Sequence, residues 1–195
     1  MNKKIILASR SKARRALLKQ MGLRFRVIKP EIKERRSLRT KPEDLVVGNA
    51  VRKARDVARR LNTGIVIGAD TVVMSGRKMI SKPKNIKDAF RTLKSITKRP
   101  QWVYTGLAVV DARTGKYLRS CVKTKVYMRP LNDKQIRDYF KKVSPLDKAG
   151  SFDIQGLGGV FVKRIEGCFY NVVGLPIAAL AHMLDESGID VFSST

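Results

Sequence analysis

Short apolar runs alternate along the chain with segments of helical spacing, and this alternation limits the fold more than any other feature. The runs at 5–8 and 65–67 are typical of buried strands. Segment 11–22 follows the first run with apolar residues at helical spacing and predicts a helix opened by a serine, and a longer segment that begins at Pro42 repeats this spacing. Residues 101–128 predict two long strands around a central Thr-Gly turn. Strands that alternate with helices, together with one long antiparallel hairpin, predict an α/β fold built on a mixed sheet.

Further patterns extend this prediction along the chain. Helical spacing recurs over 85–96 and 132–143, and a last helix is expected to have Pro176 in its first turn. In the long helix described above, Lys53 falls beside the apolar stripe, so we expect it to face inward. The glycines within 156–159 do not have the G-x-G-x-x-G spacing and precede a strand pattern. They therefore favour a tight loop or a β-bulge over a dinucleotide site.

The length of the chain suits one domain or two closely packed lobes, and we take residues 1–195 as a single domain. Hydrophobic residues make up 43% of the chain, which is enough to build a core. No apolar run reaches the roughly 18 residues that cross a bilayer, and the apolar part of the first 15 residues is too short for a signal peptide. We therefore expect a cytoplasmic protein that does not enter the membrane.

Cysteine and histidine are too few and too dispersed for a metal centre of the zinc type. Cys121 and Cys168 have no histidine or cysteine neighbour at ligand spacing, so we expect reduced packing residues. The single histidine, His182, lies in an apolar helical pattern, where a structural or partly exposed role is expected.

The charge of the chain is its most unusual quantity. It carries 42 Lys and Arg against 16 Asp and Glu, for a net charge of +26. Such a surface attracts polyanions, which include nucleic acids and phosphate-bearing small molecules. The cations are spread along the whole sequence, without a zinc-finger spacing or an RNA-recognition signature. Most of them are expected to form a solvated surface.

One carboxylate stands out because it follows a buried strand pattern directly. Asp70 comes after the run at 65–67 and the small pair Gly68-Ala69, and Lys82 lies a short way beyond. Small neighbours leave room for a ligand beside this carboxylate. The alternative is that Asp70 begins a turn or caps an element.

Polar and cationic residues also gather where the first strand pattern meets the first helix pattern. Ser9, Ser11, Lys12, Arg14 and Arg15 all lie there. Free amides and the helix dipole favour anions at a helix N-terminus, so a phosphate would fit. The alternative is a capped amphipathic helix with a basic outer face.

Eight strings along the chain resemble, in order, those of the Maf family of nucleoside triphosphate pyrophosphatases. They are LASRSKARRALL, IKE, NAVRKA, GADTVV, SKP, VYTG, PLDKAGSFDIQG and NVVGLP. The resemblance covers nearly the whole chain. It implies a mixed twisted sheet with flanking helices that form two lobes around a deep cleft. It also implies hydrolysis of a nucleoside triphosphate to the monophosphate and pyrophosphate with a divalent metal, usually by a homodimer.

Carried over residue by residue, the resemblance implies a set of catalytic and binding residues. Asp70 would activate water, and Glu34 together with Asp70 would hold Mg²⁺ or Mn²⁺, both of which prefer oxygen ligands. The groups expected to point at the triphosphate are Ser9, Arg14, Lys53 and Lys82. Phosphoryl transfer depends on positioning and charge neutralisation, which suits this set.

The resemblance also implies a base preference. Thr71 and Gln155 match the members that act on dTTP and UTP, and a glutamine amide can both donate to and accept from a pyrimidine edge. Three positions depart from the pattern. Ala13 replaces an arginine of that subgroup, Gln101 replaces a frequent histidine, and Lys33 replaces an acid beside Glu34. CTP or modified pyrimidine nucleotides are therefore further candidate substrates.

Two other classes of function compete with the enzyme. One is a non-enzymatic nucleic-acid-binding protein that uses the strongly basic surface, and the other is a regulator of cell division with the same fold. A binding protein has no need of Asp70 and Glu34 in a cleft lined with Lys53 and Lys82, whereas the enzyme does. Nonspecific nucleic-acid affinity remains an expected side property of this charge.

Overall fold

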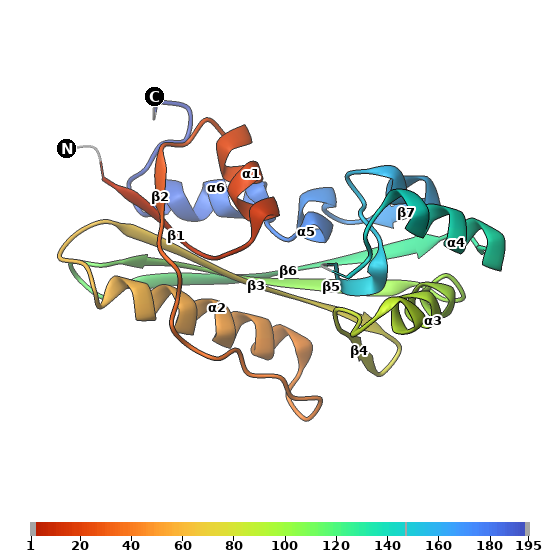
Figure 1. Ribbon diagram of the computed structural model, residues 1–195. Coiled ribbons are helices and arrows are strands. Elements are labelled where there is room, and N and C mark those ends of the chain that lie inside the picture. Colours follow the sequence, from red (N-terminus) through yellow and green to blue (C-terminus); the bar gives the residue numbers. More distant parts are fainter. Residues whose placement is uncertain (1–2, 147, 194–195) are drawn as a thin grey trace. The chain divides into compact units, whose positions relative to one another are not determined.

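The computed structural model describes residues 3–146 and 148–193. Their helices are α1 (Lys12–Gln20), α2 (Pro42–Ala58), α3 (Ile86–Ile96), α4 (Asp133–Lys142), α5 (Phe169–Val173) and α6 (Ile177–Glu186). Their strands are β1 (Ile5–Ala8), β2 (Phe25–Val27), β3 (Ile65–Ser75), β4 (Lys78–Ile80), β5 (Gln101–Asp111), β6 (Tyr117–Met128) and β7 (Val162–Glu166). The predicted α/β fold with a mixed sheet and flanking helices is confirmed (Figure 1).

The seven strands form one sheet in the order β2-β1-β3-β5-β6-β7, and β4 pairs with β3 off this path. β1 is parallel to both β2 and β3, whereas the β3–β4 and β6–β7 pairs are antiparallel. All four residues of β1 are buried, as expected for a strand that has neighbours on both edges. The hairpin between β5 and β6 closes with a hydrogen bond from the Asp111 amide to the Lys116 carbonyl oxygen, 3.0 Å long.

The chain divides into two compact units. Unit 1 is built from three stretches, Met1–Thr71, Tyr104–Val122 and Val173–Thr195. Unit 2 is built from two, Val72–Val103 and Lys123–Val172. The strands β3, β5 and β6 each contribute residues to both units.

Unit 1 holds its strands between helices on two faces. α2 covers one face, and α1 and α6 lie on the other (Figure 1). The core beneath α2 joins small and branched residues of the helix to strands β1, β3 and β5, with Ala50, Ala54 and Val66 among its fully buried members. α1 begins at Ser11, whose hydroxyl accepts the Arg14 amide at 3.3 Å and so caps the helix as predicted.

Unit 2 has its own core, in which α3 and α4 pack with β4, β5 and β6. Leu93, Ile96 and Ile136 are fully buried there, and the Tyr139 and Phe161 rings meet edge to face. Helices α3 and α4 begin at the asparagines of the predicted segments, Asn85 and Asn132. Both asparagine side chains accept a backbone amide three residues on.

Several local predictions need correction. Strand β4 and helix α5 were not expected, because each is too short to show a period. Pro176 is the residue before α6 rather than part of its first turn. The prediction for the glycines within 156–159 is confirmed, because a tight 3-10 turn over Leu157–Phe161 leads into β7, and the β6–β7 register shifts between Tyr127 and Met128.

The cysteines and the histidine lie near the protein surface. Cys121 and Cys168 are partly exposed, and neither is joined in a disulfide within the described residues. His182 is exposed and lies 2.9 Å from Glu186 one turn later on α6. Of the helices that the structure describes, none is both long and apolar enough to span a bilayer.

Candidate active site

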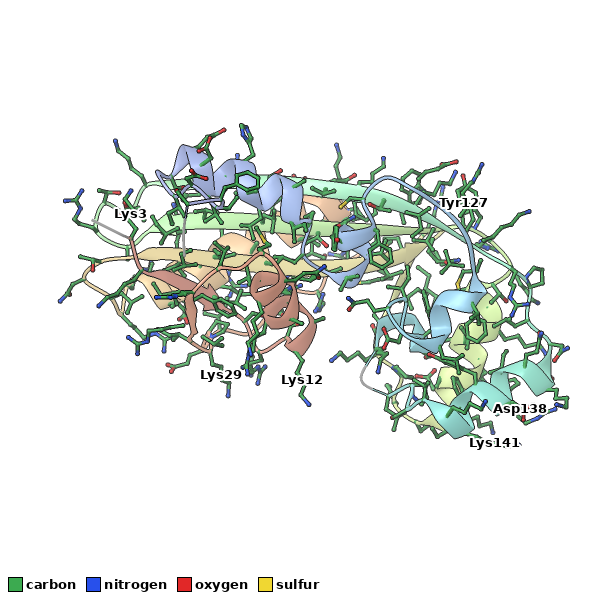
Figure 2. All side chains as sticks on the ribbon, turned by 90° about the horizontal axis from the view of Figure 1, so that it is seen from above. Lys3, Lys12, Lys29, Tyr127, Asp138 and Lys141 are labelled. Atoms are coloured by element: carbon green, nitrogen blue, oxygen red, sulfur yellow. The ribbon has the colours of Figure 1, made fainter. Side chains whose placement is uncertain are left out.

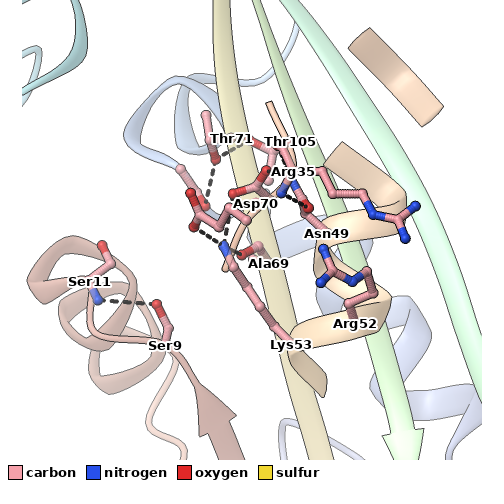
Figure 3. A network of polar contacts seen from close by, with 12 residues as sticks. Ser9, Ser11, Arg35, Asn49, Arg52, Lys53, Ala69, Asp70, Thr71 and Thr105 are labelled. Carbon is pink, nitrogen blue, oxygen red and sulfur yellow. Dashed lines mark hydrogen bonds and ion pairs between the residues drawn. The ribbon is translucent and has the colours of Figure 1, made fainter. Parts of the chain in front are cut away.

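A cluster of ionised side chains lies in unit 1 where α2 passes over β3 (Figure 3). Asp70 is 2% exposed and Lys53 is 5% exposed, although both carry charge. Lys53 Nζ lies 2.8 Å from Asp70 Oδ1 and 2.5 Å from Glu34 Oε1. One buried ammonium group therefore holds two carboxylates beside each other, and we call Glu34, Lys53 and Asp70 the carboxylate cluster.

Asp70 occupies this place because β3 continues through it. The strand runs on to Ser75, so the interpretation of Asp70 as a turn residue is wrong. Gly68, two residues before Asp70, does not leave room for a ligand as expected. A Cβ atom on Gly68 would lie 2.3 Å from the Ala50 carbonyl oxygen, so the space beside Gly68 is filled by the α2 backbone. A Cβ atom on Gly106 of β5 would likewise lie 2.3 Å from the Val46 backbone of α2.

This close approach lets a short side chain of α2 reach Asp70. Asn49 is 1% exposed and donates from Nδ2 to Asp70 Oδ2 at 2.8 Å. Its amide also pairs with the backbone of Arg35, accepting from the amide and donating to the carbonyl oxygen, both at 2.9 Å. Asn49 thus fixes the loop that carries Glu34 and orients Asp70 at the same time.

Asn49 did not stand out from the sequence, although a signal was present. It precedes Lys53 by four residues on α2, which places both side chains on one face of the helix. A buried asparagine and a buried lysine one turn apart both need polar partners, and Asp70 supplies one to each.

Lys53 uses all its donors within this region. An ammonium group has three protons, and the structure gives Lys53 three acceptors: Asp70, Glu34 and the Ala69 carbonyl oxygen, the last at 3.1 Å. The prediction that Lys53 faces inward is confirmed. Its predicted contact with a triphosphate would require exchange of one of these partners.

The electrostatics of the cluster favour ionised carboxylates. Burial of Glu34 opposes its ionisation, but the hydrogen bond and charge of Lys53 and the charge of Arg36 outweigh burial and lower the pKa of Glu34 to about 2. Arg36 pairs with Glu34 and also lies 3.8 Å from Asp70 Oδ2. Two cations thus lie beside two acids, and the lowered pKa keeps Glu34 charged at neutral pH.

Arg14 is a buried residue of α1 in unit 1 and links this helix by hydrogen bonds to β3 and to the segment at Gly174. It donates to the Gly174 carbonyl oxygen at 2.9 Å, the Ala69 carbonyl oxygen at 3.0 Å and Thr71 Oγ1 at 2.9 Å. Burial lowers the pKa of the guanidinium below its ordinary value. Thr71 Oγ1 also lies 2.8 Å from Thr105 Oγ1, so its hydroxyl belongs to a buried polar network.

The remaining predicted residues lie in different places. Ser9 is buried in unit 1 and accepts the Ser11 amide at 3.1 Å, and Ala13 is partly exposed on α1. Lys82 and Gln155 are exposed residues of unit 2. Gln101, also in unit 2, is 2% exposed and donates to the Ile96 and Arg99 carbonyl oxygens at the end of α3.

The donor set of the carboxylate cluster suits a hard divalent cation. Mg²⁺ is commonly held by one or two carboxylates together with phosphate oxygens, and Glu34 and Asp70 supply such a pair. Over 3–146 and 148–193, no group of three or more His, Cys, Asp or Glu side chains is arranged to hold a metal by itself. The cluster thus fits a metal that a substrate helps to bind.

Comparison with known proteins identifies the family of the chain. The family described as Maf-like protein matches residues 4–187. A relative from Dictyoglomus turgidum named dTTP/UTP pyrophosphatase is 43% identical over 189 residues, which are 96% of this chain and 98% of the relative. Relatives with the same name from Methanosarcina barkeri and Clostridium kluyveri are 40% and 41% identical over 191 residues, at least 96% of either chain. With its motifs matched over nearly its full length, the chain belongs to the Maf-like protein family.

Proposed function

We propose that this protein hydrolyses nucleoside triphosphates, with UTP and dTTP as the main substrates, to the monophosphate and pyrophosphate. The observation that carries the proposal is the carboxylate cluster, in which buried Lys53 holds Asp70 and Glu34 together. The names of the relatives support the same reaction. A protein that only binds nucleic acid or regulates division has no use for two carboxylates held this way, so those alternatives are not favoured.

The proposed reaction is attack of water on the α-phosphorus of the triphosphate. The water oxygen forms a bond to phosphorus, the bridging oxygen leaves with pyrophosphate, and the water proton passes to the Asp70 carboxylate. Asn49 and Lys53 donate to different oxygens of Asp70 and leave further lone pairs for that proton. They fix the orientation of the base.

The proposed metal is Mg²⁺ or Mn²⁺ at Glu34 and Asp70, where it would supply positive charge to the triphosphate oxygens. The cations and hydroxyls proposed for the same triphosphate are Ser9, Arg14, Lys53 and Lys82. Ser9 Oγ accepts the Ser11 amide, and its proton can still be donated to a phosphate oxygen. Arg14 has three of its five N–H groups engaged, which leaves two for a ligand.

The base would be read by Thr71 and Gln155, with CTP or a modified pyrimidine as further substrates. The Thr71 hydroxyl is held by Arg14 and Thr105, so it offers a fixed rather than a mobile polar edge. Ala13 provides no hydrogen bond of its own. Ala13→Arg is expected to raise turnover of pyrimidine nucleotides if position 13 belongs to the substrate pocket.

The deciding experiment measures pyrophosphate release from a panel of UTP, dTTP, CTP, ATP and 7-methyl-GTP with Mg²⁺ or Mn²⁺. Phosphate counted with and without added inorganic pyrophosphatase separates loss of pyrophosphate from loss of the terminal phosphate. Asp70→Asn should reduce turnover about a hundredfold or more while the melting temperature stays near that of the wild type. Retention of more than about a tenth of the turnover would make Asp70 a structural residue.

Asn49 serves as a positioning residue in this proposal. Asn49→Ala should lower kcat more than it raises KM, because Asn49 is proposed to act through Asp70, to which it donates. Asn49→Gln keeps the amide but moves it by one methylene, so it should recover little activity. If kcat fell only in proportion to the free energy of unfolding across both substitutions, Asn49 would be a purely structural residue.

An assembly and a location are also proposed for the protein. A homodimer follows from the family resemblance, and light scattering after size exclusion tests it. A cytoplasmic location suits an enzyme of nucleoside triphosphates, and cell fractionation tests that.

A further inference from the structure

The sheet of unit 2 has one face that the proposed function does not use. Along the end of β6, Thr124, Val126 and Met128 are buried against the core, while the alternate residues point to the opposite face. Those alternate residues are Lys123, Lys125 and Tyr127. Tyr127 and Asp138 of α4 lie at opposite sides of this unit (Figure 2).

On this face, cationic groups lie against aromatic rings in an unbroken series. Lys123 Nζ is 4.5 Å and Lys125 Nζ is 5.3 Å from the centre of the Trp102 ring. Lys125 Nζ is also 5.0 Å from the Tyr127 ring, which Arg164 Cζ approaches to 4.2 Å. We call these five residues the basic aromatic face; they come from β5, β6 and β7.

Strand register explains why these side chains meet. Tyr127 pairs with Arg164 and Lys125 pairs with Glu166 across the β6–β7 ladder, so each pair shares a face of the sheet. Glu166 is an acid on this face, and it is engaged by the Tyr127 hydroxyl at 3.0 Å and by Arg164 at 2.8 Å. The basic aromatic face therefore has a net positive charge.

We propose that the basic aromatic face binds single-stranded nucleic acid. Its lysine and arginine groups can neutralise successive phosphates, and the rings on a rigid sheet can stack with unpaired bases. The cations in contact with the rings are partly exposed or exposed, so they can move to a phosphate when a base takes their place. The net charge of +26 supplies long-range attraction for any polyanion, whereas the rings add a preference for bases.

The single tryptophan of the chain provides a local probe, because Trp102 belongs to the face. An unlabelled oligothymidylate of about 20 nucleotides exceeds the usual site of a stacking platform. Titration of this oligonucleotide into the wild-type protein should quench the tryptophan fluorescence to a plateau. Heparin, a polyanion without bases, should bind with much less quenching.

Two charge-matched double variants separate this face from the general surface charge. Lys123→Gln with Lys125→Gln removes two cations of the face, and Lys134→Gln with Lys141→Gln removes two exposed cations of α4. In anisotropy titrations with labelled oligothymidylate, the first pair should raise Kd about tenfold and the second less than about twofold. Both proteins should hydrolyse UTP at the wild-type rate, so failure here is distinguishable from failure of the proposed function.

Tyr127→Leu tests the contribution of the ring. It should weaken oligothymidylate binding about tenfold and leave heparin binding unchanged, since only bases can stack. Equal losses in the two double variants, unchanged tryptophan fluorescence at saturation, or equal sensitivity of heparin and oligothymidylate to Tyr127→Leu would each overturn the proposal.

Discussion

The approach of α2 to β3 at Gly68 gives the sharpest test of how the site is built. A Cβ atom at this position would lie 2.3 Å from the Ala50 carbonyl oxygen, whereas real Cβ contacts are essentially never shorter than 3.0 Å. Gly68→Ala therefore requires α2 to move from the strand by at least about 0.7 Å. The obstacle is helix backbone in a packed core, so no side-chain rotation can relieve it.

The magnitude follows from two consequences of that movement. Overpacking of a core costs about 1–3 kcal/mol, and we expect about 3 kcal/mol here because backbone atoms clash. The contacts from Asn49 and Lys53 to Asp70, both 2.8 Å, would lengthen to the limit of a hydrogen bond. Stability and turnover should therefore fall together.

Gly48→Ala is the matched control for this substitution. Gly48 lies in the exposed part of α2, and a Cβ atom there would meet nothing within 4 Å. Alanine in a helix interior is favoured over glycine, so this variant should gain about 0.5–1 kcal/mol and keep its turnover.

Urea unfolding followed by circular dichroism, together with UTP turnover, measures both effects. With a slope of about 2 kcal/mol per molar urea, Gly68→Ala should lower the midpoint by about 1.5 M. A midpoint within about 0.3 M of the wild type, with turnover unchanged, would refute the claim that close backbone approach builds the site.

Further predictions concern individual side chains. Lys53→Met leaves Asp70 and Glu34 without their shared cation, so it should lower the free energy of unfolding in urea by about 3–5 kcal/mol and remove most of the turnover. Its counterpart Lys82→Ala, at an exposed position, should lower kcat/KM about tenfold at unchanged stability. Gln155→Glu removes an amide donor and should reduce UTP turnover at least tenfold more than ATP turnover, and an unaltered substrate ranking would exclude Gln155 from base recognition. The pKa of Glu34 is lowered from 4.5 to about 2, so its contribution to stability is complete above pH 4.5 and declines as the pH falls toward 2; the difference in unfolding free energy between wild type and Glu34→Gln should shrink over that interval.

The periodic parts of the fold could be predicted from the sequence. Burial on both sides makes β1 and the start of β3 continuous apolar runs, and capping residues such as Ser11 and Asn132 mark where helices begin. Lys53 could be placed inward because it borders the apolar stripe of α2. In each case the residues that determine the local structure lie within a few positions of it in the sequence.

Contacts between distant segments could not be predicted this way. The loop with Glu34 has no period, and contacts with distant residues determine where it lies, among them the pairing of Asn49 with the Arg35 backbone and of Lys53 with Glu34. Local spacing likewise says nothing about why Arg14 meets Gly174, 160 residues away. Gly68 shows the same limit, because a small residue leaves space for either a ligand or a helix.

The assembly of unit 1 from three separated stretches has a consequence for synthesis on the ribosome. Domains tend to fold as units while the chain emerges from its N-terminal end. Arg14 is made before its Gly174 partner, which belongs to the last of the three stretches that form unit 1. Until that stretch leaves the exit tunnel, the guanidinium lacks one of its acceptors, and α6 is not yet in place on its face of the sheet. Unit 1, which carries the carboxylate cluster, therefore stays incomplete until its third stretch has emerged, and a ribosome stalled before that point would present an unfinished core to chaperones.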